Sequence, residues 1–214
     1  MLAVSRYYLA LLGHSQRYLP AGLAYLALCS ILYADPSSPV LPLYGVSGAG
    51  VLVLGCWLTI ALLDIEDPVQ RLITLNHAGG NRKTIGGAVL TVFGCTLMCT
   101  LATVAWAATH RNQLHWQIVS AGLVTHLACA LVGIAIGLPC SRLLVSRIGW
   151  TVLAAVLVLG VVLLGKGVPI VHPLLEALMS GSPYGGPLAL ATGTSVALLA
   201  ASMTVVGAVS TRRS

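Results

Sequence analysis

The feature that most constrains this chain is a series of long apolar runs, each about the length an α-helix needs to cross a bilayer. A helix of about 20 residues spans roughly 30 Å of hydrocarbon and satisfies its backbone amides internally. Only 7% of the residues are charged, whereas a water-soluble domain carries roughly 25%. The sequence therefore predicts one all-α membrane domain over residues 1–214 with six transmembrane helices, at roughly 18–34, 44–63, 85–109, 117–139, 149–166 and 187–209.

The N-terminal segment, residues 1–19, carries polar residues where a cleavable signal peptide needs an uninterrupted apolar region. Arg6, His14 and Arg17 are among these residues. We expect the segment to form an amphipathic helix in the membrane interface. Its apolar face is expected to hold Tyr8, Leu11, Leu12, Ser15 and Leu19.

The basic residues indicate the orientation, because Lys and Arg near a span are retained on the cytoplasmic side. We expect a multi-pass plasma-membrane protein whose N- and C-termini are cytoplasmic. Topology and anionic headgroups then account for the net charge of +6, so the charge gives no reason to expect nucleic acid as a partner. Only Arg111 and Lys166 are expected outside, and the cytoplasmic set is Arg6, Arg17, Arg71, Arg82, Lys83, Arg142, Arg147, Arg212 and Arg213.

Small and sulfur-containing residues within the spans are interpreted as packing elements. The six cysteines fall within spans or at their ends, which predicts neither a disulfide framework nor a metal site. Gly133 and Gly137 form a G-x-x-x-G pattern, which permits close helix approach. Packing inside the chain is the favoured use of this pattern, and a dimer contact is the alternative.

The longest expected outer loop, residues 167–186, combines three prolines with the apolar stretch "PLLEALM". Two interpretations stay open. The stretch could enter the bilayer as a re-entrant hairpin, or it could lie in the interface as a loop helix. Its acidic residue, Glu176, is expected to be solvated, with contact to a cationic substrate as the alternative.

A polar stretch, "DIEDPVQRLITLNHAGGNRKT" at 64–84, interrupts the apolar sequence between the second and third spans. Asp67 followed by Pro68 is typical of a helix start, and Gly79 with Gly80 is typical of a helix end. The helix is predicted over 68–78, with Asp64, Glu66 and Asp67 at its positive end. One stripe of this helix holds Val69, Leu72, Ile73 and Asn76, and it requires a partner, which is either the headgroup layer or a protein.

This layout resembles the permease subunits of type-two ABC exporters (the type V exporter fold). At residue level, "SQRYLPAGLAYLALCSILYA" and "EDPVQRLITLNHAGGNRK" are similar to parts of small actinobacterial members. The resemblance implies a cytoplasmic coupling helix that docks on a separate ATPase, which binds ATP and Mg²⁺, and a second permease chain as partner. It implies no cofactor in this chain, and it assigns ATPase coupling to Glu66, Asp67, Pro68, Val69, Arg71, Leu72, Ile73 and His77.

Two further motifs suggest chemistry within the chain. "GVVLLGKG", from Gly160, matches the start of a phosphate-binding loop but lacks the required Ser or Thr, so nucleotide binding there is excluded. Ser47 in "GVSG" and His126 on a later glycine-rich span resemble the serine and histidine of rhomboid-type intramembrane proteases. Three roles remain open for this pair: an intramembrane serine protease, a transport path, or structural hydrogen bonds within the bundle.

Overall fold

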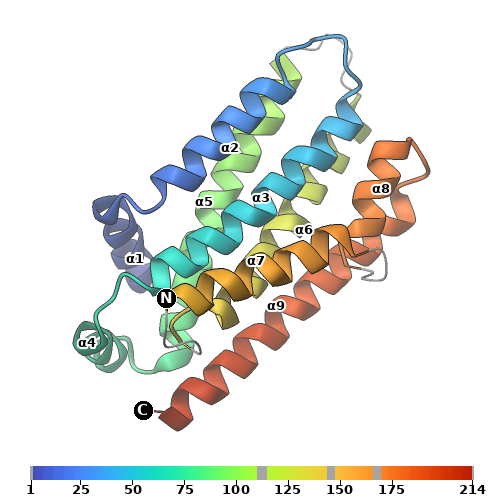
Figure 1. Ribbon diagram of the computed structural model, residues 1–214. Helices are drawn as coiled ribbons and strands as arrows, with labels where there is room; N and C mark the ends of the chain where they lie inside the picture. Colours follow the sequence, from blue (N-terminus) through green and yellow to red (C-terminus); the bar gives the residue numbers. More distant parts are fainter. Residues whose placement is uncertain (1, 110–114, 144–147, 166–169, 214) are drawn as a thin grey trace.

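The computed structural model describes residues 2–109, 115–143, 148–165 and 170–213. Arg111, Arg147, Lys166 and residues 167–169 of the predicted outer loop lie outside these ranges. Within them the chain forms nine α-helices and no strand (Figure 1). The helices are α1 (Leu2–Ser15), α2 (Leu19–Leu32), α3 (Val40–Leu63), α4 (Pro68–Ala78), α5 (Asn81–Thr109), α6 (Trp116–Cys140), α7 (Ile148–Leu164), α8 (His172–Ser180) and α9 (Gly185–Arg213).

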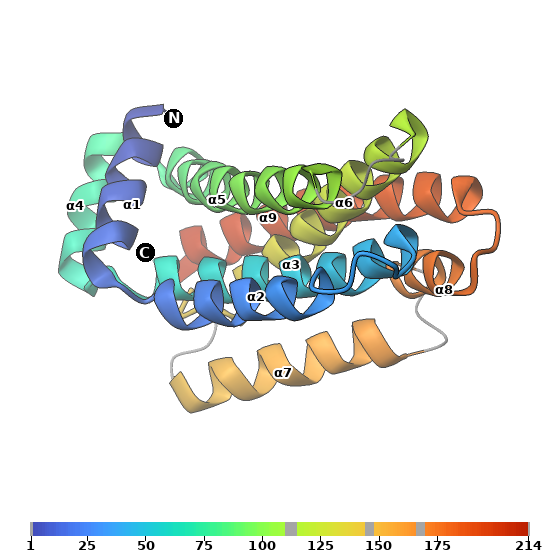
Figure 2. The ribbon, with the colours of Figure 1, turned by 90° about the horizontal axis from the view of Figure 1, so that it is seen from above.

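The helices form one elongated bundle. Six of them, α2, α3, α5, α6, α7 and α9, run along the same general direction (Figures 1 and 2). Helices α1 and α4 cross the bundle direction at one end, and α8 lies at the other end (Figure 2). The prediction of an all-helical architecture, with short helices at 68–78 and within 167–186, is therefore confirmed.

Four helices of the described chain are long and apolar enough to cross a membrane, namely α3, α5, α6 and α9. This finding is consistent with the prediction of a helical membrane protein. The other two predicted spans correspond to shorter helices, α2 with 14 residues and α7 with 17. Fourteen helical residues extend only about 21 Å, which is less than the thickness of the hydrocarbon layer.

The centre of the bundle is the contact between α3 and α6, where glycines let two backbones approach closely. A Cβ added at Gly133 would lie 2.2 Å from the backbone oxygen of Leu52, and one at Gly137 would lie 2.6 Å from the Cβ of Thr59. No side chain larger than hydrogen fits at such distances. The G-x-x-x-G pattern therefore packs within the chain, as predicted.

The N-terminal helix is shorter than predicted. Helix α1 ends at Ser15, and Gln16 has a φ of 53°, so the chain turns before α2 begins. Leu19 consequently belongs to the next helix and is exposed, which corrects its assignment to the apolar face of residues 1–19. Tyr8 and Leu12 are buried in the main hydrophobic cluster, because α1 packs against α5 and α3.

Helix α5 begins at Asn81, four residues before the predicted start of the third span at residue 85. The reason is that Gly79 and Gly80, with φ of 72° and 122°, complete the turn out of α4 within two residues. Arg82 and Lys83 therefore lie in the first turn of α5 and not in a loop. The Asn81 side-chain amide donates to the Gly207 carbonyl and contacts Ser210, which ties this helix start to the end of α9.

At the opposite end, α8 folds onto the protein. Leu174, Ala177 and Leu178 are buried, and a Cβ at Gly45 in α3 would lie 3.7 Å from the Leu178 Cβ. Helix α8 also contacts α9. These three residues of "PLLEALM" are covered by α3 and α9, whereas Met179 is exposed. Gly181 ends the helix in the left-handed conformation.

The α3–α6 contact generates a first prediction. Gly133→Ala is expected to force the two backbones apart and to lower the stability by about 1 to 3 kcal/mol, the usual cost of overpacking. Thermal unfolding in detergent measures the effect. The matched control is Gly160→Ala in α7, where an added Cβ meets no atom within 4 Å. Equal melting temperatures for the two variants would contradict the proposed role of this contact.

Candidate functional site

Helix α4 has the limits that its sequence predicts. The Asp67 side chain accepts a hydrogen bond from the Val69 amide at 3.0 Å, and Asp67 itself has an extended backbone. At the other end, Gly79 adopts the left-handed conformation, and its N–H and that of Gly80 bond to the last turn. Local capping thus sets both ends of an 11-residue helix.

The three acids at the start of α4 separate into different roles. Only Asp67 caps the helix. Asp64 follows the end of α3 and accepts from the Arg142 backbone N–H at 2.9 Å, so it joins the ends of α3 and α6. Glu66 is only 7% exposed and turns toward α1. The carboxylates of Asp64 and Glu66 thus bind tertiary partners, which their predicted place at the positive end of the helix dipole did not indicate.

Glu66 is the centre of what we call the α1–α4 junction, formed by Tyr7, Tyr8, Glu66, Gln70 and Thr74. Its carboxylate accepts from the Tyr8 hydroxyl at 3.2 Å and from the Thr74 hydroxyl at 3.0 Å. The Gln70 side-chain amide donates to the Tyr7 hydroxyl at 2.8 Å. Burial, reinforced by the nearby Glu66 charge, raises the pKa of Tyr8 well above its usual range, so the phenol remains a donor.

Because the junction binds the polar face of α4, the apolar stripe of this helix faces away from the bundle. Val69, Leu72 and Ile73 are 66%, 56% and 55% exposed. In Figure 2, α4 lies beyond α1 at the end of the bundle. The coupling residues assigned from sequence are thus divided between an exposed stripe and a polar face. Tyr7 and Tyr8 bind that polar face, and no pattern in the sequence predicted this role for them.

Two cavities flank α4. One, of about 610 Å³, lies between α4, the start of α5 and the end of α9, and Arg71 and Leu72 line it. The other, of about 460 Å³, lies between α4 and α1, and Ile73 and His77 line it. Burial lowers the pKa of Arg71, although the guanidinium also lies near Glu66. Helix α4 therefore lies between two cavities and separates them.

Ser47 and His126 meet inside the bundle, although 79 residues separate them in the chain. The His126 Nδ1 lies 2.7 Å from the Gly122 carbonyl, which can only accept, so Nδ1 carries the proton. In a neutral ring Nε2 then accepts, and it lies 2.9 Å from the Ser47 hydroxyl. That hydroxyl also lies 2.9 Å from the Leu43 carbonyl and 3.1 Å from the Tyr33 hydroxyl.

We call Tyr33, Tyr44, Ser47 and His126 the Ser47 cluster. The rings of Tyr44 and His126 meet edge to face at 5.7 Å, and Gly122 provides the space for Tyr44. Ser47 and His126 are both 0% exposed, and neither residue lines either of the two cavities that flank α4. The geometry provides a hydroxyl beside an imidazole acceptor, but in this conformation the pair is enclosed.

The sequence patterns did not predict that the two tyrosines belong to this cluster. Tyr33 follows the end of α2 and Tyr44 lies in the first turns of α3, where an aromatic residue predicts only an interfacial anchor. No spacing in the sequence connects either tyrosine with Ser47. Among the described residues, no three His, Cys, Asp or Glu side chains gather as metal ligands would.

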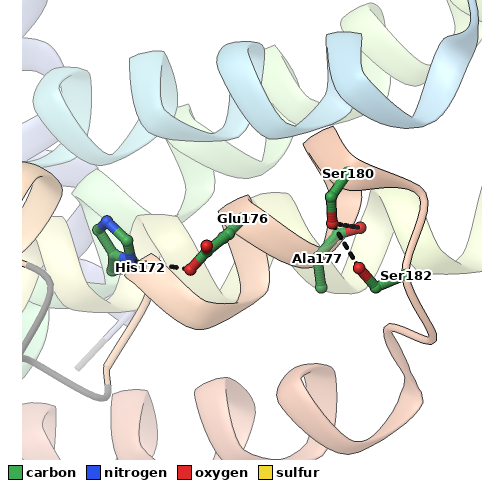
Figure 3. Close-up of polar contacts among 5 residues, drawn as sticks. All are labelled: His172, Glu176, Ala177, Ser180 and Ser182. Atoms are coloured by element: carbon green, nitrogen blue, oxygen red, sulfur yellow. Dashed lines mark hydrogen bonds and ion pairs between the residues drawn. The ribbon is translucent and has the colours of Figure 1, made fainter.

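At the end of the bundle opposite α4, helix α8 presents a polar face. The His172 Nδ1 lies 3.7 Å from the Glu176 Oε2, and the two side chains point toward one another along the helix (Figure 3). Ser180 and Ser182 contact each other where the helix ends (Figure 3). The Glu176 side chain is 73% exposed, which agrees with the expected solvated carboxylate.

Comparison with known proteins suggests no function for this chain. No protein-family model, curated protein or solved structure matches this chain significantly. The α1–α4 junction with its exposed stripe and the Ser47 cluster are therefore the two features from which function is inferred.

The α1–α4 junction generates a second prediction. Tyr8→Phe removes a donor from a buried carboxylate, which costs about 1.5 to 3 kcal/mol for a hydrogen bond to a charged group. We expect faster proteolysis within residues 64–84. Because the Tyr8 pKa is raised, this stabilisation is complete below the ordinary tyrosine pKa of about 10 and is lost as the pH rises further.

Tyr7→Phe is the control, since the Tyr7 hydroxyl accepts a hydrogen bond from the exposed Gln70 side chain. Equal rates of proteolysis in the two variants would contradict the role of Tyr8.

Proposed function

We propose that this chain is the permease subunit of an ATP-driven ABC exporter, coupled to ATP hydrolysis by a separate ATPase subunit. The observation that carries the proposal is the orientation of α4. Its polar face is bound to α1 and Glu66, while Val69, Leu72 and Ile73 are exposed. A short helix that holds its apolar side outward on a ridge is suited to enter a groove on a partner protein.

The connections of α4 support a mechanical role. Asp64, directly after α3, is bonded to the backbone of Arg142 after α6, and only two residues separate the end of α4 from the start of α5. A displacement of α4 would therefore reach α3, α5 and α6 over short, hydrogen-bonded connections. In this proposal, ATP-driven closure of the ATPase moves α4 and shifts the bundle between two states that bind substrate with different affinities.

The proposed topology has six spans, in which α2 and α7 also cross the membrane. The bilayer around the short helix α2 would then be locally thinned, as around other short spans. Tyr25 and Tyr33 connect α2 to α5 and α3 through hydroxyl contacts, so α2 lies beside two of these long helices. The described basic residues Arg17 and Arg142 meet at Asp64, on the same end as α1 and α4. We assign this end to the cytoplasm, which places both termini there, in the plasma membrane.

Other parts of the proposal concern partners and path. A second permease chain, identical or related, completes the transporter, and ATP and Mg²⁺ bind to the ATPase. The residues around α8, within 167–186, form the proposed outer hairpin. Ser47 and His126 are enclosed between α2, α3 and α6, so they reach a substrate only when these helices separate.

The exposed stripe of α4 generates a third prediction. Leu72→Asp and Ile73→Asp are each expected to weaken copurification with an ATPase encoded beside this chain by at least about tenfold, because burial of such a side chain contributes about 1.5 to 3 kcal/mol. Quantitative pull-down in detergent measures the loss. Met179→Asp in α8 is the control, since it adds the same charge at an exposed apolar residue on the opposite end. Unchanged ATPase retention by both α4 variants would overturn the proposal.

A second candidate function is supported by the Ser47 cluster. We propose that this cluster is the catalytic site of a rhomboid-like intramembrane serine protease. The Ser47 hydroxyl lies 2.9 Å from a nitrogen of the His126 imidazole, and the Gly122 carbonyl orients that ring. In the reaction, Ser47 Oγ would attack a carbonyl carbon while its proton passes to His126 Nε2. The leaving amine would then receive that proton from the imidazolium. This function requires an opening to Ser47 that the enclosed conformation lacks.

A fluorophosphonate probe separates the two candidates and provides the fourth prediction. If the chain is a serine hydrolase, the probe labels the wild-type protein at Ser47, and both Ser47→Ala and His126→Gln lose labelling by at least about a hundredfold, in line with loss of a general base. Ser30→Ala is the control, because Ser30 is exposed and bonds only its own helix at Leu26. Absence of labelling in membranes and in detergent would remove this candidate.

A further inference from the structure

We propose that the 610 Å³ cavity between α4, α5 and α9 is a binding site for the phosphate of an anionic phospholipid headgroup. This inference is independent of the ATPase and of the Ser47 cluster. The cavity is within the size range of small-molecule sites. Its lining combines Arg71, four uncharged polar side chains, two glycines and three leucines, namely Asn76, Asn81, Ser210, Thr211, Gly79, Gly80, Leu72, Leu75 and Leu143.

The position of the cavity places it at the level of headgroups. Asn81 is the first residue of α5, Ser210 and Thr211 lie in the last turn of α9, and Leu143 follows the end of α6. These three helices are among the four that are long enough to cross a membrane. A cavity bounded by three span ends lies at the boundary between hydrocarbon and water, where lipid phosphates are found.

The charges around the cavity favour an anion. Arg71 is one of the residues that line it, and the Lys83 Nζ lies beside Gly79, 3.3 Å from where a Cβ would be. The lining contains no acidic residue. Glu66 also lies near Arg71, and its carboxylate accepts hydrogen bonds from Tyr8 and Thr74 on the side of α1. Arginine binds phosphate through paired N–H donors, and lysine adds a second positive charge.

Asn76 and the start of α5 can add donors to the site. Asn76 brings a side-chain amide, whereas the Ser210 and Thr211 hydroxyls already donate to carbonyls of α9. The start of α5 at Asn81 adds the positive end of a helix dipole, which favours negative charge. The Asn81 side chain already bonds Gly207 and Ser210, so it fixes one wall of the cavity.

The apolar part of the lining selects a lipid over a free phosphate. Leu72, Leu75 and Leu143 offer a surface for the glycerol and the first methylenes of an acyl chain. A soluble anion would gain nothing from this surface, whereas burial of methylene groups contributes about 0.8 kcal/mol each. A lipid bound here contacts both α4 and the end of α9, and it therefore holds α4 against the bundle.

The site is tested on the full chain, purified in a neutral detergent without any ATPase. Phosphatidylglycerol, phosphatidylcholine with the same acyl chains, and inorganic phosphate are titrated separately, and thermal stability and bound lipid are measured. We expect phosphatidylglycerol alone to raise the melting temperature. Arg71→Ala and Lys83→Ala should each weaken its binding by about tenfold to a hundredfold, the range for a lost charge-assisted hydrogen bond.

Arg6→Ala is the matched control, because Arg6 is an exposed arginine of α1, at the same end of the bundle but outside the cavity lining. Lys83 is exposed, so its variant reports on binding even if Arg71→Ala unfolds. Equal weakening in Arg6→Ala would show general surface attraction and overturn the site. Stabilisation by inorganic phosphate to the same extent would overturn the lipid as occupant, and no effect of phosphatidylglycerol would overturn the proposal entirely.

Discussion

Close contact between α3 and α6 is the constraint on which the arrangement of the other helices depends. Lipid tails are as apolar as the side chains of the spans, so helices in a membrane associate through packing and hydrogen bonds. Gly133 and Gly137 provide this packing, since the α3 backbone at Leu52 and Cys56 lies where their side chains would be. The same approach, continued toward the other end of the pair, brings Ser47 into contact with His126.

A second consequence of packing is the orientation of α4. In a soluble protein the apolar stripe of such a helix would face the core. Here the buried Glu66 carboxylate needs donors, because an unpaired buried charge is costly. Tyr8 and Thr74 supply these donors, and the hydrogen bonds keep the polar face of α4 inward. The exposed stripe is thus stabilised by a polar contact on the opposite side of the same helix.

Both candidate features depend on polar groups whose partners are distant in sequence. Ser47 and His126 satisfy each other with Tyr33, Leu43 and Gly122, and the cluster is enclosed. Helix α4 contacts α1 through its polar face, exposes its apolar stripe and lies between two cavities. This difference in access is the physical reason that the exporter function rests on α4, whereas the protease function requires an additional opening motion.

The sequence by itself determined the helical membrane class, the ends of α4 and the use of Gly133 and Gly137, because apolar length, capping residues and missing side chains act locally. It did not determine the start of α5, the extent of α2 or the partners of Glu66. Tyr8 and Glu66 are 58 residues apart, and Ser47 and His126 are 79 apart. Contacts over such separations depend on how helices pack, and packing also decided which face of α4 is exposed, since capping and periodicity define a face but not the direction in which it points.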